Sequence, residues 1–343
     1  MIYTEYTKIK KCIVHSVGNK SEDEGIYLSD DTIELDDLTS QTLQKYLLGQ
    51  VVSEGYCEFW HESQLHLNEL YSFTKAIFDD DSSFVEMSSN IAKHLYACSL
   101  HPKIKSGELC VVYLKNVIID TVTCDAIGLF KSENKDTFLK VVANGYQSEI
   151  KSDTGININK VDKAAIIFDT NADTGYWVTV VDRTNKASEA KYWTDEFLKV
   201  RPQKNSYNQT ENLIAVTREF VSKMAPSEFK SDKAAVINRS NGAICVDRVN
   251  VVDYAKKVFG DDNVAQRFTE FAKKRGEDTG MPMDEEFQSS QQVINKKRTT
   301  TLTSLKLDQN FDIRIHGGED LLEKGYDAVK RMKYYKLYFK EEK

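Results

Sequence analysis

The sequence predicts an α+β protein built from more than one domain. Residues 1–200 contain short apolar runs separated by turn-forming residues, together with some stretches of helical spacing. Residues 206–285 have mainly helical spacing, and strand-like alternation returns within residues 286–343. A chain of 343 residues is too long for one comfortable core. We therefore expect three parts over these ranges: an N-terminal α+β domain with a mixed sheet and helices, a helical region, and a small β-rich C-terminal region.

In the N-terminal domain, strands are predicted where apolar residues follow one another between turn signals. One helix is expected around Leu38–Leu47 and a second over Asn68–Phe78. A third begins at the capping cluster Asp81–Ser83 and ends before Pro102, which disfavours helical geometry in the residue ahead of it. The predicted strands are Lys8–Val17, Ile26–Ser29, Leu109–Val117, Ile127–Phe130, Phe138–Val142, Ala164–Phe168 and Tyr176–Asp182.

The C-terminal half is predicted to change from helices to strands. A tract containing Gly280 and Pro282 ends the helical series. Beyond it, TLTSLKLD and FDIRIHG alternate apolar and polar residues on either side of a turn, which is typical of a hairpin. A final strand, Tyr334–Phe339, alternates aromatic residues with lysine. The predicted helices are Thr210–Met224, Asp232–Asn238, Val249–Phe259 and Val264–Lys274.

Composition indicates an intracellular, cytoplasmic protein. No apolar run approaches the roughly 20 residues that a membrane span requires, so we expect no membrane association. The N-terminus lacks the apolar region and cleavage site of a signal peptide. The six cysteines contain no Cys-x-x-Cys pair, which disfavours a zinc ribbon and a thioredoxin-type motif. We expect free thiols, and neither a metal nor a cofactor.

Charge is distributed unevenly along a chain whose formal net charge is −7. Residues 1–100 contain 7 basic and 17 acidic residues, whereas residues 296–343 contain 12 basic and 8 acidic ones. This asymmetry is compatible with an acidic body and a C-terminal part that faces nucleic acid. It is also common in proteins that bind no nucleic acid.

The candidate DNA-binding residues lie in this C-terminal part. Lysine and arginine contact phosphates, and tyrosines can stack on bases or line a groove. An edge strand protected by lysines against aggregation is the alternative, and the small basic excess favours it on the residues alone. The candidates, which precede a threonine run or interleave with Tyr334, Tyr335 and Tyr338, are Lys296, Lys297, Arg298, Lys330, Arg331, Lys333 and Lys336.

One pattern suggests enzymatic chemistry. Asp120 or Asp125, followed by Glu133-Asn134-Lys135, resembles the acidic residue and Glu-x-Lys of a metal-dependent nuclease. Two carboxylates would hold Mg²⁺, and the lysine would help to activate water. Glu133 and Lys135 are predicted to lie in a polar turn, where alternate residues need not face one pocket. We therefore expect these side chains not to converge, and the protein not to be an enzyme.

Several long segments carry a family resemblance. The central ones are HPKIKSGEL, DAIGLFKSENKDTFLKV and GININK, flanked by VHSVGNKSEDEGIYLSDDTIELDD, YWVTVVDRTNKASEAKYWTDEFL, LKLDQNFDIRIHG and MKYYKLYF. Together they resemble the bacterial nucleoid-associated NdpA family over nearly the whole chain. The resemblance implies association with the nucleoid and DNA binding without strong sequence preference. It also implies a link, for some members, to DNA topoisomerases, and no established catalytic residues.

Two classes of function therefore remain. The leading hypothesis is a non-enzymatic nucleoid protein that binds DNA weakly through its C-terminal region, with a homodimer as one assembly to test. A variant is an adaptor whose acidic N-terminal half engages a DNA-handling protein such as a topoisomerase. The alternative class is a metal-dependent nuclease or other DNA-processing enzyme built around Asp125, Glu133 and Lys135.

Overall fold

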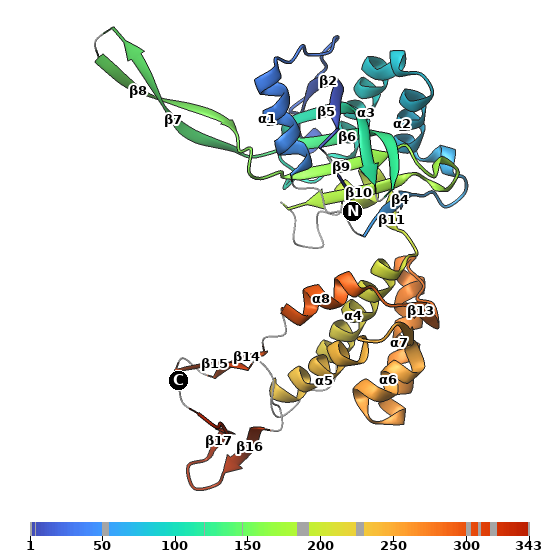
Figure 1. Cartoon of the computed structure of the whole chain (residues 1–343), viewed down its shortest axis with the longest axis vertical. Helices are drawn as coiled ribbons and strands as arrows, with labels where there is room; N and C mark the ends of the chain where they lie inside the picture. Colours follow the sequence, from blue (N-terminus) through green and yellow to red (C-terminus); the bar gives the residue numbers. More distant parts are fainter. Residues whose placement is uncertain are drawn as a thin grey trace. The chain divides into compact units, whose positions relative to one another are not determined.

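The chain forms two compact units in the computed structural model, residues 1–203 and 204–343 (Figure 1). We describe each unit by itself. The residues that the structure describes are 2–3, 5–49, 55–119, 121–145, 147–183, 192–223, 230–299, 303–307, 310–315 and 321–341.

A nine-stranded sheet forms the centre of the first unit. Each strand pairing that the structure describes is antiparallel, which corrects the expectation of a mixed sheet, while the α+β class is confirmed. Short links join β5 to β6 and β9 to β10, and a parallel neighbour would need a long crossover instead. In spatial order the strands are β11 (Val200–Pro202), β4 (Cys57–Phe59), β10 (Trp177–Asp182), β9 (Lys163–Phe168), β6 (Val122–Ser132), β5 (Gly107–Ile119), β2 (Lys8–Val17) and β3 (Ile26–Tyr27), with β1 (Ile2–Tyr3) paired to β5.

Helices cover both faces of this sheet. The side chains of successive strand residues point to opposite faces, so Val111 of β5 packs in the core with α2 (Glu69–Asp79) and α3 (Phe84–Cys98). Its neighbour Val112 packs in a separate core with α1 (Asp37–Leu48). Burial on two faces explains the continuous apolar runs that made these strands recognisable. Shorter helical turns are η1 (Lys20–Glu22), η2 (Leu65–Leu67), η3 (Asp81–Ser83), η4 (Ala172–Thr174) and the π-helical turn η6 (Tyr192–Leu198).

One hairpin of the first unit stands apart from the large sheet. Within the described residues, its strands β7 (Lys135–Asn144) and β8 (Gln147–Ile156) pair with each other and with no other strand, and Figure 1 shows them projecting from the body of the unit. We call residues 135–156 the arm. The predicted strand Phe138–Val142 lies within β7, whereas β8 was not expected, because the segment QSEIKSDTGI contains few apolar residues.

The second unit is built around helices. They are α4 (Ser206–Lys223), α5 (Lys230–Ala243), α6 (Val251–Phe259), α7 (Asp262–Thr279) and α8 (Gln291–Thr299), with a small sheet of β12 (Arg248–Asn250) and β13 (Glu286–Gln288). Phe220, Tyr254 and Phe268 are buried at the centre of their core. Val293 and Ile294 of α8 pack in the same core. Helix α8 was not expected from the sequence, and with it the helical core extends beyond residue 285.

Two hairpins complete the second unit. The first pairs β14 (Thr303–Leu307) with β15 (Phe311–Ile315), as the alternating sequence predicted. The second pairs β16 (Leu322–Asp327) with β17 (Met332–Leu337), of which only β17 was expected. Within the described residues, none of the helices combines the length and apolar character needed to cross a bilayer.

Candidate nucleic-acid interface

The last hairpin holds four of the seven candidate DNA-binding residues. We call residues 321–341 the terminal hairpin. Residues 328–331 form its loop, in which the Asp327 carboxylate accepts hydrogen bonds from the backbone N–H groups of Val329 and Lys330, both at 2.9 Å. Arg331 closes the loop in the left-handed region, with φ +53°. Lys330 and Arg331 are both exposed, so the hairpin presents two basic residues at its loop.

The strand register places the remaining two candidates, Lys333 and Lys336, on opposite faces of the terminal hairpin. Lys333 lies opposite Tyr326, whereas Lys336 lies opposite Glu323. Because positions two apart share a face of a strand, Lys333 and Tyr335 belong to one face of the hairpin and Lys336 to the other. Lys333 and Lys336 therefore cannot contact one flat ligand together. The sequence had grouped them by proximity alone.

Lys336 forms an ion pair with Glu323. Its Nζ lies 3.2 Å from Glu323 Oε2 and 4.9 Å from the centre of the Tyr338 ring. The Tyr338 hydroxyl donates to the same carboxylate oxygen, and the pKa of Glu323 is lowered by this hydrogen bond and by Lys336. A carboxylate so close to Lys336 weakens its attraction for phosphate. Lys336 is thus a weaker candidate than Lys330 and Arg331 at the loop.

Aromatic residues accompany the basic ones. Tyr326 is 56% exposed, and it lies on the same face as Lys333. Tyrosine can stack on an unpaired base or pack against sugar, and base stacking is tolerant of sequence. Tyr326 was not expected from the sequence, because the segment LEKGYD of β16 shows no regular alternation of apolar and polar residues.

The other three candidates lie at the end of α8. The backbone of Lys296, Lys297 and Arg298 belongs to the last turn of that helix. Their side chains are outside the described part of the structure, so their geometry stays untested. Near a helix C-terminus, basic residues also stabilise the helix by countering its dipole.

The positive charge of the second unit is concentrated in residues 321–343. Residues 1–203 contain 21 basic and 31 acidic residues, a balance of −10. Residues 204–320 are neutral, with 18 of each, and residues 321–343 contain 7 basic and 4 acidic residues. The positive excess of the second unit therefore comes entirely from the end of the chain.

The residues of the suggested nuclease pattern lie far apart. The Asp125 carboxylate accepts a hydrogen bond from the Tyr113 hydroxyl at 2.8 Å and pairs with Lys115. Glu133 lies eight positions further along, past the end of β6, which corresponds to about 26 Å of extended strand. There it is buried and lies 3.2 Å from Lys131 Nζ. These residues do not form one site.

The other residues of the nuclease pattern, and a search for possible metal ligands, also give no support to a nuclease site. Lys135 pairs with Glu108, and Asp120 lies outside the described residues. Within the described residues, no three His, Cys, Asp or Glu side chains are grouped so that they could hold a metal ion. The nuclease interpretation therefore has no geometric support in the described part of the chain.

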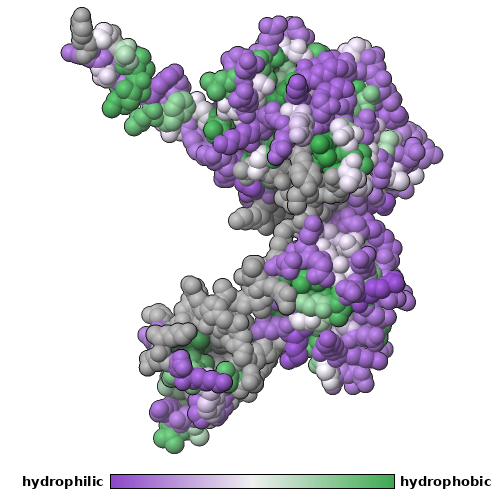
Figure 2. Space-filling model, in the orientation of Figure 1, coloured by the Kyte–Doolittle hydropathy of each residue, from purple (hydrophilic) through white to green (hydrophobic). Residues whose placement is uncertain are grey.

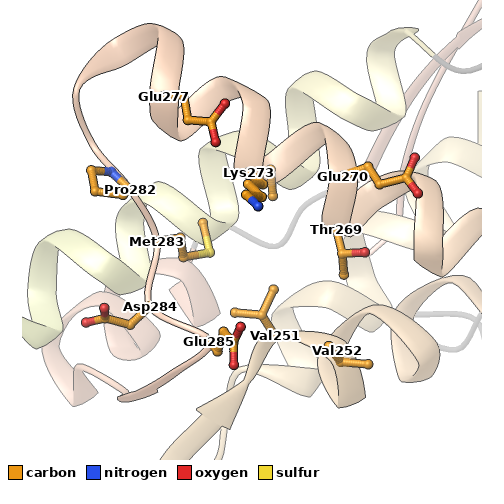
Figure 3. Close-up of a pocket in the computed structure, with 11 residues that line it drawn as sticks. Val251, Val252, Thr269, Glu270, Lys273, Glu277, Pro282, Met283, Asp284 and Glu285 are labelled. Carbon is orange, nitrogen blue, oxygen red and sulfur yellow. The ribbon is translucent and has the colours of Figure 1, made fainter.

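A pocket of about 510 Å³ opens in the second unit between α6, α7 and the segment that follows α7 (Figure 3). Its apolar floor includes Val251 and Met283. Four carboxylates and one lysine line it: Glu270, Glu277, Asp284, Glu285 and Lys273. Such an acidic lining repels phosphate, so this pocket is not part of a nucleic-acid surface.

The comparisons agree with these observations. A search of curated proteins gives no match to the chain. Residues 13–331 match the family described as nucleoid-associated protein YejK, which is also called NdpA, and this confirms the resemblance. With nearly its whole length matched, the chain belongs to the YejK family of nucleoid-associated proteins.

Proposed function

We propose that this chain binds DNA without strong sequence preference through its terminal hairpin, as a non-enzymatic protein of the cytoplasmic nucleoid. The observation that carries the proposal is the concentration of positive charge in residues 321–343, where Lys330 and Arg331 are exposed at a loop. Membership of a nucleoid-associated family supports it. The family resemblance adds a DNA topoisomerase as a proposed partner, for which the acidic first unit is the candidate surface.

The proposed contacts join basic side chains to the phosphates of DNA. Each lysine or arginine that neutralises a phosphate releases counterions, which gives affinity without sequence information. A net excess of three positive charges supports weak binding only. We assign the contacts to Lys330, Arg331 and Lys333, and a lesser part to Lys336 because Glu323 competes for it.

The test replaces Lys330, Arg331 and Lys333 together by alanine. Binding to two unrelated duplexes of equal length should weaken by the same factor. The plot of log affinity against log salt concentration should flatten by up to about 3, since each phosphate contact contributes about 0.9 to its slope. Fluorescence anisotropy at several salt concentrations measures both quantities. DNA recovered from the same reactions in Mg²⁺ should be intact.

Lys336→Ala is the matched control, because it removes a lysine from the same hairpin that is already paired with Glu323. It should change the affinity less than Lys330→Ala or Arg331→Ala. Undiminished binding by the triple variant would move the site to Lys296–Arg298. A strong preference for one duplex would contradict the proposal itself.

A further inference from the structure

One valine at the loop of the terminal hairpin is almost completely exposed. Val329 is 95% exposed, whereas Leu38, the next most exposed large apolar side chain of the described residues, is 75% exposed. Single exposed apolar residues are common on protein surfaces. Val329, however, is followed directly by Lys330 and Arg331, which are exposed as well. The loop therefore presents one apolar side chain together with two cationic ones, and Figure 2 shows hydrophobic surface (green) at the lower end of this hairpin.

The loop holds Val329 in a defined position. The Asp327 carboxylate accepts hydrogen bonds from the backbone N–H groups of Val329 and Lys330. In the strands next to the loop, the ring of Tyr334 lies over Gly325 and leaves no space for a Cβ there. Valine is branched at Cβ, so its side chain is stiff. Val329 therefore loses little conformational freedom when it enters a confined site.

The width of the hairpin limits how it can meet a DNA duplex. Neighbouring strands lie about 4.8 Å apart, so a two-stranded ribbon spans about 10 Å. The minor groove is only about 6 Å wide, so the loop can enter it but the strands cannot. The negative potential of this groove attracts lysine and arginine. Lys330 and Arg331 would thus bring the side chain of Val329 to the base pairs.

Other strongly exposed apolar residues lack this combination with basic neighbours. Leu139 of the arm is 72% exposed, but the three lysines of the arm are balanced by three acidic residues. Leu38 directly follows two aspartates. Phe339 is followed by one lysine and two glutamates. DNA phosphates would not attract these segments, whereas they would attract the loop that contains Val329.

We propose that Val329 is an apolar wedge, which inserts between two stacked base pairs from the minor groove and kinks the duplex. Proteins that deform DNA in this way combine an apolar wedge with basic residues in the same groove. Burial of the wedge offsets part of the cost of unstacking. Insertion requires no base-specific contact, although flexible steps such as TA open most easily. The inference deepens the proposed function and rests on it, since the terminal hairpin must first bind DNA.

The first experiment measures unstacking directly with the full chain and a duplex that contains 2-aminopurine at a TA step. Fluorescence of this base rises when it leaves the stack. Saturating wild-type protein should raise it, and most of this rise should be lost in Val329→Ser but kept in Val329→Leu. Val329 is exposed, so both variants should fold. The phosphate contacts remain in both, so the salt dependence of binding should stay unchanged.

Leu337→Ser is the matched control. Leu337 is an apolar residue of the same hairpin that is 49% exposed. It lies five positions beyond Met332, about 17 Å along the strand from the loop. Leu337→Ser should therefore unstack the duplex as well as the wild type does.

The second experiment measures unwinding. A nicked plasmid is sealed by DNA ligase in the presence of each protein, and the linking number is read after the protein is removed. A wedge unwinds the duplex, so circles sealed with the wild type should have a lower linking number than circles sealed without protein. At equal occupancy, Val329→Ser should lose most of this shift, and Val329→Leu and Leu337→Ser should keep it.

Two kinds of failure are distinguishable, because fluorescence anisotropy of the same duplex measures binding alone. Wild-type protein that binds without unstacking or unwinding would overturn the wedge and leave the proposed DNA binding intact. A Val329→Ser variant that unstacks and unwinds as the wild type does would also overturn it. Wild-type protein that binds no duplex would overturn the wedge and the proposed function together.

Discussion

At the residue scale, His15 makes the stability of the first unit depend on pH. Its imidazole is fully buried, its Nδ1 accepts a hydrogen bond from the Ser29 backbone N–H at 3.2 Å, and its Nε2 lies 3.1 Å from Ser88 Oγ. The accepting Nδ1 places the hydrogen of the neutral ring on Nε2. Burial lowers the pKa of His15 to about 4, so protonation is disfavoured in the folded state.

The sign of the resulting pH dependence follows from linkage. A pKa lower in the folded state than in the unfolded one gives stability that is present above about pH 6.5 and lost as the pH falls towards 4. The loss from His15 should reach about 3 kcal/mol. Urea unfolding at several pH values, followed by tryptophan fluorescence, measures it. His15→Gln should lose less stability over this range than the wild type, although half-buried His94, whose pKa is also lowered by burial, contributes to both. Parallel curves would refute the assignment.

Residue positions also show why sequence alone could not define the candidate interface. Lys333 and Lys336 look equivalent in MKYYKLYF, and only the pairing with β16 reveals that they lie on opposite faces of the hairpin, with Lys336 beside Glu323. In the same way, Asp125 and Glu133 look close in the sequence. They are separated because the strand between them is extended and not bent.

At the element scale, Asn68 joins the start of α2 to the segment that leads into β11. Its side-chain oxygen accepts a hydrogen bond from the Tyr71 backbone N–H at 3.0 Å, which caps the helix. Its side-chain nitrogen donates to the carbonyls of Trp60, Leu198 and Lys199, at 3.0–3.2 Å. Asn68 is fully buried, so water cannot replace the hydrogen bonds that its side chain makes with these groups.

Asn68→Ala should therefore destabilise the first unit by about 3 kcal/mol, since several buried polar groups lose their partner. Asp36→Ala, at the exposed cap of α1, is the control and should destabilise the unit much less, because water can replace the lost hydrogen bond there. Asn68→Asp keeps the acceptor for Tyr71 but faces three carbonyl oxygens with a carboxylate, so it should not restore stability. Denaturant midpoints measured by tryptophan fluorescence test this order, and a stable Asn68→Asp variant would contradict it.

The elements that the sequence predicted well are those with buried faces. Lys8–Val17 is β2 as expected, because its apolar residues pack on both sides. β8 was missed because it exposes eight of its ten residues, and a polar exposed strand has no periodic apolar signal.

At the scale of the whole molecule, the two units contain separate hydrophobic cores. All three tryptophans, Trp60, Trp177 and Trp193, belong to residues 1–203. We expect two unfolding transitions, of which tryptophan fluorescence reports one and far-ultraviolet circular dichroism reports both. Transitions that coincide by both methods, in the full chain and in Asn68→Ala, would show that the units unfold together. The three-part division suggested by the sequence stays a prediction.

The uneven charge of the units has a consequence for the encounter with DNA. Residues 1–203 have a formal charge of −10, whereas residues 321–343 have a formal charge of +3. In the DNA binding proposed above, the field of the polyanion would attract the positive end of the chain and repel the acidic unit before contact. Collisions through the positive end would thereby be favoured. The surface of the acidic unit would then remain accessible to a second protein.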